Sequence, residues 1–188
     1  MDQPTGVVSN SVGSATSNTA TLTVTTTVTD TSAPSIPAGL SASTVSRSQI
    51  NLTWSASSDN VGVVGYTVYR NGVKVATVLT TSYQDSGLSA LTSYTYAVSA
   101  YDAAGNVSGK SQNASATTYK FSIGDVVHVT TNHLKVRSSA GGTWIGTQRY
   151  GATGTVVAGP TNANGYTYWK VDYTSGVDGW SAQDWLSQ

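Results

Sequence analysis

Short runs in which apolar and polar side chains alternate are the feature of this sequence that most restricts its fold. Between residues 49 and 102 the alternation has a period of two, which is the period of a half-buried β-strand. The run 66–70 ends at Asn71-Gly72, the dipeptide that most strongly indicates a two-residue hairpin, and the run 73–78 returns. About seven such runs separated by turn residues predict an all-β chain with a β-sandwich.

The composition supports an all-β fold and excludes several classes of partner. Only 10% of the residues are charged, against about 25% in an average globular protein. The chain has nine acidic and nine basic residues and no glutamate, so its net charge is zero. Nucleic acids and anionic membranes call for a basic surface, so we expect neither as a partner. The sequence has no cysteine, which excludes disulfides and cysteine-ligated metals.

We expect the sequence to contain neither a membrane-spanning run nor a signal peptide. No apolar stretch approaches the length that crosses a bilayer. The opening Met1-Asp2-Gln3-Pro4 lacks the basic and apolar regions of a secretory signal. The cysteine-free composition is typical of bacterial secreted or cell-surface proteins. Since the opening residues do not resemble a secretion signal, we expect the chain to be a piece of a longer precursor.

Residues 1–32 consist mainly of small and hydroxylated side chains. Ala20, Leu22 and Val24 alternate with threonines, which predicts a half-buried strand. Residues 10–24 resemble the closing hairpin of a bacterial immunoglobulin-like domain. A single hairpin is marginally stable in water, so two alternatives stay open. The segment is either a strand remnant followed by a linker or a strand that completes a sheet edge, in its own chain or in a neighbouring copy.

Residues 33–118 carry four segments in a characteristic order. These are Pro37-Ala38-Gly39-Leu40, Leu52-Thr53-Trp54, Gly65-Tyr66-Thr67-Val68-Tyr69-Arg70 and Tyr94-Thr95-Tyr96-Ala97-Val98-Ser99-Ala100-Tyr101-Asp102. Together they resemble a bacterial fibronectin type III domain. The resemblance implies a β-sandwich with Trp54 in its core. It also implies that Tyr94 forms a tyrosine corner, with its phenol bonded to upstream backbone. Ala90 stands where the family usually has proline.

Residues 119–188 contain about five short strand-like runs punctuated by glycines, which suggests a small bent barrel. The segments that match a known pattern are Leu134-Lys135-Val136-Arg137-Ser138, Gly146, Gly151, Trp169-Lys170-Val171, Gly179-Trp180 and Trp185-Leu186. In this order and spacing they resemble a bacterial SH3-like domain. The resemblance implies a module that binds cell-wall peptidoglycan, often its peptide cross-bridges, and targets an attached protein to the wall. Lys135 stands where asparagine is common and Trp185 where tyrosine is common.

Four of the five tryptophans lie in this last region, and we expect them to divide into two groups. Trp169, Trp180 and Trp185 are predicted to be core or rim framework, because a small barrel in a chain with one phenylalanine has few other large side chains to bury. Trp144 follows a glycine turn, and exposed loop aromatics are costly unless they contact something. Local packing is the alternative for such rings. The candidate ligand-binding residues are Trp144, Tyr150, Tyr166, Tyr168 and Tyr173.

The sequence shows no arrangement typical of an enzyme. There is no Gly-x-Ser-x-Gly motif and no cysteine nucleophile, and a glycosidase pair would have to consist of two aspartates. Asp59, Asp85 and Asp102 stand in turn-like contexts, where aspartate bonds local backbone, with calcium binding as the alternative at Asp59. His128 and His133 lack a third zinc ligand at a suitable spacing. We therefore expect no catalytic residues, no metal and no cofactor.

The predicted function is that of a non-catalytic extracellular fragment with two modules. The fibronectin-like part would be a spacer, and the SH3-like part would bind cell-wall peptidoglycan or a polysaccharide on behalf of a larger secreted or surface protein. The alternative is a structural subunit of a stalk, adhesin or filament, in which the strand at residues 20–24 completes a sheet in another copy. Binding of proline-rich peptides, as in eukaryotic SH3 domains, is a third hypothesis. The absence of the acidic loop that such domains usually have disfavours it.

Overall fold

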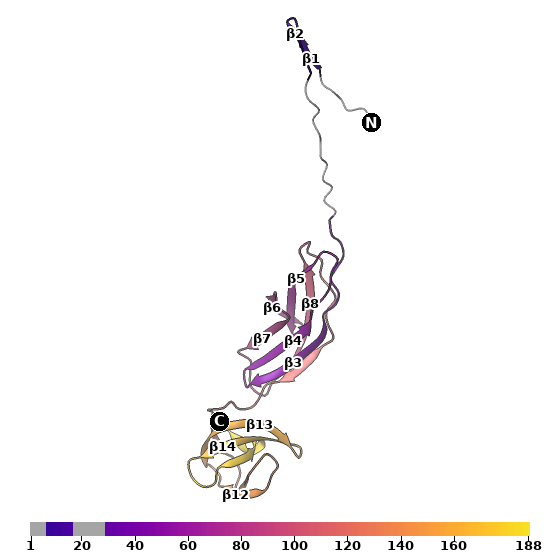
Figure 1. Ribbon diagram of the computed structural model, residues 1–188. Helices are drawn as coiled ribbons and strands as arrows, with labels where there is room; N and C mark the ends of the chain where they lie inside the picture. Colours follow the sequence, from indigo (N-terminus) through magenta and orange to yellow (C-terminus); the bar gives the residue numbers. More distant parts are fainter. Residues whose placement is uncertain (1–6, 17–28) are drawn as a thin grey trace. The chain divides into compact units, whose positions relative to one another are not determined.

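The computed structural model describes residues 7–16 and 29–188 and divides the chain into two units, Met1–Asp30 and Thr31–Gln188 (Figure 1). In the first unit, β1 (Val7–Asn10) pairs antiparallel with β2 (Gly13–Thr16). The strand predicted at residues 20–24 lies outside the described residues. The described part of the chain contains no helix long and apolar enough to cross a membrane.

The second unit begins with two antiparallel sheets that face each other as a sandwich (Figure 1). One sheet has the order β3-β4-β7, and the other has the order β6-β5-β8-β9. The strands are β3 (Ala38–Ser46), β4 (Gln49–Ser55), β5 (Val63–Arg70), β6 (Val73–Val78), β7 (Ser82–Ser86), β8 (Ser93–Asp102) and β9 (Ala114–Thr117). The predicted all-β class and the sandwich are confirmed.

The core of the sandwich follows from the period-two alternation of its strands. In β4 the side chains of Ile50, Leu52 and Trp54 are buried, while the residues between them are exposed. The Trp54 ring meets the Tyr66 ring edge to face at a centroid distance of 5.5 Å, an arrangement that aromatic pairs prefer. The prediction that Trp54 is a core residue is therefore confirmed.

Two turns form as their residues predict. Asn71 and Gly72 have φ values of 51° and 83°, which suit the type I′ turn of a two-residue hairpin between β5 and β6. At the other turn, the Ser89 backbone N–H donates to the Tyr94 hydroxyl at 3.0 Å. This bond is the predicted tyrosine corner, and it ties the start of β8 to the loop before it.

Asp85 corrects one prediction from the sequence. It lies in β7 rather than in a turn, and only 2% of its surface is exposed. Its carboxylate accepts two hydrogen bonds from Arg70 Nη1, at 2.9 and 3.0 Å, and one from the Tyr96 hydroxyl at 2.8 Å. Since Arg70 and Tyr96 belong to the opposite sheet, this carboxylate joins the two layers of the sandwich.

The C-terminal sheet has seven antiparallel strands in the order β12-β11-β15-β14-β13-β10-β16. Its strands are β10 (Val126–Val129), β11 (Leu134–Arg137), β12 (Trp144–Gln148), β13 (Thr153–Ala163), β14 (Tyr166–Tyr173), β15 (Gly179–Ala182) and β16 (Leu186–Ser187), with a 3-10 turn, η1 (Gln183–Trp185), before the last one. Trp144 thus begins a strand, where the sequence predicted a loop.

Trp169 is the centre of the C-terminal core. Only 1% of its surface is exposed, and its ring meets those of Phe121 and Tyr119 edge to face at 5.8 and 5.9 Å. Gly159 passes close to it, since a Cβ at that position would lie 3.0 Å from a ring carbon of Trp169. The φ of Gly159 is 118°, so glycine is favoured there for its backbone as well. The prediction that Trp169 is framework is confirmed.

Segment 119–125 connects the sandwich to the C-terminal sheet. Beside its contact with Trp169, Tyr119 donates its hydroxyl hydrogen to the Thr44 carbonyl at 3.3 Å. Arg47, between β3 and β4, forms an ion pair with Asp125 at 3.2 Å. The beginning of the C-terminal sheet is therefore bonded to the β3–β4 end of the sandwich.

Candidate ligand-binding site

A pocket of about 400 Å³ opens in the C-terminal sheet beside β11, β14 and η1. Tyr166, Tyr168 and Trp185 form one part of its lining, and Lys135 and Arg137 form another. Ala182 and the segment that leads into β11, residues 131–134, complete it. The pocket thus combines aromatic rings with cationic side chains, a combination suited to ligands that have both apolar and polar groups.

The aromatic part of the pocket comes from β14 and η1. Tyr166 and Tyr168 are two residues apart on one strand, so their side chains leave the same face of the sheet. The Tyr166 and Trp185 rings lie 5.7 Å apart with planes tilted by 33°, and Tyr166 meets Tyr168 at 6.3 Å. Tyr166 is 43% exposed and Trp185 is 39% exposed, whereas Tyr168 is buried beneath them. Two rings are therefore available for contact, and a third supports them.

The cationic part comes from a single strand. In β11, Leu134 and Val136 are buried in the core, so Lys135 and Arg137 leave the opposite face together. Arg137 Nη1 donates to the Gly142 carbonyl at 2.7 Å, which fixes the guanidinium. In the part of the chain that the structure describes, the ion pairs join Arg47 to Asp125 and Arg70 to Asp85, so neither cation of β11 is neutralised by a carboxylate.

The five predicted ligand-binding residues fall into different environments. Tyr166 and Tyr168 line the pocket together. Trp144 lies outside its lining, 58% exposed on β12, with Lys135 Nζ 5.8 Å from its ring centroid. Tyr150 is 70% exposed and also lies outside the lining. Tyr173 is buried in the core, where a ligand cannot reach it, so we leave it out of the site.

Sequence reasoning missed most residues that line the pocket, and Trp185, Lys135 and Arg137 are the missed ones that matter for ligand contact. The sequence predicts framework for Trp185, whereas the structure shows the ring 39% exposed in the lining of the pocket. In the sequence, Lys135 and Arg137 stand out only as part of the motif Leu134-Lys135-Val136-Arg137-Ser138. The signal available for them was the alternation of β11, which places two cations on the face opposite two buried aliphatic residues.

Tyr173 gives the C-terminal sheet a pH dependence that can be measured. Burial raises the pKa of Tyr173 to about 12, and its hydroxyl donates to Ser181 Oγ at 2.7 Å. The pKa of a tyrosine in an unfolded chain is about 10, so the unfolded chain loses this proton first as the pH rises. The contribution of Tyr173 to the free energy of unfolding is therefore fully present below about pH 10. Between about pH 10 and 12 the free energy of unfolding should fall by up to about 1.4 kcal/mol per pH unit.

Urea unfolding across this pH range measures the effect. The Tyr173→Phe variant lacks the titrating hydroxyl, so its stability should fall less steeply than that of the unchanged chain over the same interval. An identical pH dependence in the two proteins would show that Tyr173 does not titrate in this way.

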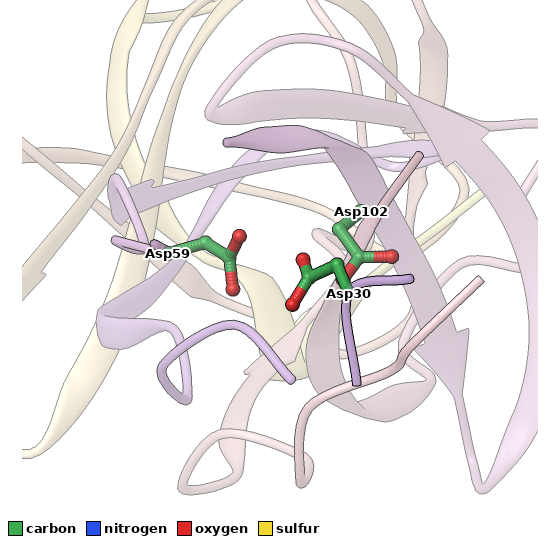
Figure 2. A group of neighbouring side chains, drawn as sticks. All are labelled: Asp30, Asp59 and Asp102. Carbon is green, nitrogen blue, oxygen red and sulfur yellow. The ribbon is translucent and has the colours of Figure 1, made fainter. Parts of the chain in front are cut away.

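Asp59 and Asp102, two acidic residues of the second unit, have carboxylate oxygens within 4.8 Å of each other (Figure 2). Asp30, also drawn there, belongs to the first unit. Asp59 Oδ2 accepts the backbone N–H groups of Val61 and Gly62, and Asp102 accepts the backbone and side-chain N–H groups of Asn106.

These bonds close local turns, as the sequence predicts for both aspartates. Asp59 Oδ1 is buried without a hydrogen-bond partner in the described residues. The described bonds of Asp59 and Asp102 are those of turn residues, and calcium binding at Asp59 stays the untested alternative.

Comparison with known proteins identifies the sandwich. The family model of the fibronectin type III domain matches residues 32–117, so this part of the chain is a fibronectin type III domain. The match ends before the C-terminal sheet begins.

Curated relatives are found among large bacterial enzymes. The alpha-amylase of Niallia circulans is 48% identical over 122 residues, which are 61% of this chain and 9% of the enzyme. Chitinase Chi52 of Paenibacillus xylanexedens is 52% identical over 89 residues, which are 47% of this chain and 17% of the enzyme. Exoglucanase A of Cellulomonas fimi is 39% identical over 178 residues, which are 90% of this chain and 18% of the enzyme. The chain therefore corresponds to a segment of less than a fifth of each relative.

Proposed function

We propose that this chain is a non-catalytic, extracellular part of a larger glycan-active protein. In this proposal the fibronectin type III domain is a spacer, and the C-terminal sheet is an SH3-like module that binds cell-wall peptidoglycan. The observation that carries the proposal is the exposed pair Tyr166–Trp185 in a pocket that also presents Lys135 and Arg137. The names of the relatives, which are a chitinase, an amylase and an exoglucanase, support the glycan context.

The pocket has the properties of a modest binding site. Aromatic rings supply a large contact area with little loss of conformational entropy, because only two side-chain torsions are fixed. Sugar rings and apolar peptide groups can both pack on such a surface. The pocket is open and small, and only two rings are exposed, so the expected affinity is modest. A modest affinity is suited to a module that keeps an attached domain near an insoluble substrate.

Retention on purified peptidoglycan tests the proposal. The unchanged chain should be retained, and Tyr166→Ala and Trp185→Ala should each weaken retention by about tenfold, the effect of losing about 1.4 kcal/mol from a central contact. Tyr150→Ala is the control, because it removes a tyrosine that is even more exposed than Tyr166 but does not line the pocket.

Two results would overturn the proposal. If the unchanged chain does not bind peptidoglycan, the proposed function is wrong. If the Tyr150→Ala control loses as much retention as the pocket variants, the proposed location of the site is wrong.

A further inference from the structure

The pocket carries a positive charge that the net charge of the chain does not predict. The whole chain has zero net charge, yet both formally charged residues in the described lining of the pocket, Lys135 and Arg137, are cations. Asp184 precedes Trp185 in η1 and is exposed, but it is not part of the lining. The pocket is therefore a local positive site on a protein whose net charge is zero.

The two cations are held in place by neighbouring groups that leave their charge uncompensated. Arg137 is bonded to the Gly142 carbonyl, a neutral acceptor, through one guanidinium nitrogen, so its other donors can still meet a ligand. Lys135 Nζ lies over the Trp144 ring at 5.8 Å, a cation–π contact that orients the ammonium without neutralising it. A planar guanidinium beside an ammonium matches a carboxylate, which accepts charge-assisted bonds from both.

We infer that the pocket recognises a free carboxylate of a peptidoglycan stem peptide. The carboxylate would accept hydrogen bonds from Lys135 and Arg137, and the adjoining peptide and sugar groups would pack on Tyr166 and Trp185. This inference rests on the proposed function and narrows it, since neutral polysaccharides such as chitin, cellulose and starch have no carboxylate to offer. Trp144 then acts as a positioning residue for Lys135 and does not itself contact the ligand.

The test compares two soluble ligands of similar size and shape, of which one has carboxylates and the other has neutral carboxamides. The full chain is titrated calorimetrically with N-acetylmuramoyl-L-alanyl-D-glutamate and with the same compound after both carboxylates are converted to carboxamides. The acid should bind at least about tenfold more tightly than the amide, and its affinity should fall as salt is added, because the contact is electrostatic. Equal affinities for the acid and the amide would overturn the inference.

Side-chain variants locate the effect. Lys135→Gln should reduce the preference for the acid about tenfold, because the acid loses a charge-assisted bond and the amide loses only a neutral one, and this exposed residue can be replaced without loss of a core contact. Lys74→Gln removes a charge from exposed β6 of the fibronectin domain and should change neither affinity. Arg137→Lys keeps the charge but loses the planar guanidinium that can donate two parallel hydrogen bonds. Its preference for the acid over the amide should therefore be intermediate. A preference that is unchanged in Lys135→Gln would contradict the assignment.

The two proposals fail in different ways. If the chain is retained on whole peptidoglycan but does not distinguish acid from amide, the function stands and the carboxylate site is wrong. If the chain is retained on no peptidoglycan preparation, the proposed function fails and the inference fails with it.

Discussion

Replacing Trp169 with alanine is expected to lower the free energy of unfolding of the C-terminal sheet by about 3–5 kcal/mol. The ring is almost completely buried and makes edge-to-face contacts with Phe121 and Tyr119. Its removal leaves a cavity that the surrounding strands cannot fill. Domains of this kind have about 5–15 kcal/mol of stability in all, so much of the stability would be lost.

Chemical denaturation followed by circular dichroism measures this loss. Trp144→Ala is the matched control, since it deletes the same ring from a position that is 58% exposed, and it should cost less than about 1 kcal/mol. Comparable destabilisation by the two variants would show that Trp169 is not the centre of this core.

Replacing Asp85 with alanine is expected to destabilise the fibronectin type III domain by about 2–3 kcal/mol. Removal of one partner from a fully buried ion pair costs about 3–5 kcal/mol, and the Arg70 side chain is 32% exposed, so water compensates part of the loss. The Tyr96 hydroxyl also loses its acceptor while it stays buried.

Thermal or urea unfolding of the variant measures the effect. Asp85→Asn keeps an acceptor for Tyr96 but loses the charge, so its stability should lie between those of Asp85→Ala and the unchanged chain. Gln84→Ala changes the exposed neighbour in the same strand and should cost less than about 0.5 kcal/mol. An Asp85→Ala variant as stable as this control would show that the bonds across the sandwich contribute little.

The fold could be predicted to a large extent from the sequence, because its signals are local. The alternation in β4 and the Asn71-Gly72 turn each depend on residues that are close along the chain, and both are observed. The role of Asp85 could not be predicted in this way. Its partners, Arg70 and Tyr96, come from the opposite sheet, and nothing near Asp85 in the sequence distinguishes it from an aspartate in a turn.

The candidate site was only partly predictable for the same reason. Tyr166 and Tyr168 stand out as neighbouring aromatics, and the structure places them in one pocket. Trp185 joins them because β15 pairs antiparallel with β14 and brings η1 beside that strand, a contact with no local signature. Lys135 and Arg137 belong to another strand, β11, so the charge of the pocket emerges only when β11 is placed beside these rings.

The distribution of tryptophans gives the chain built-in optical reporters. Trp54 is buried in the fibronectin domain and Trp169 in the C-terminal sheet, while Trp185 is partly exposed at the pocket. Indole emission shifts to shorter wavelength when water is excluded from the ring. Unfolding of the two parts can thus be followed from Trp54 and Trp169 in variants that retain one of them. Occupation of the pocket would change the emission of Trp185 without any attached dye.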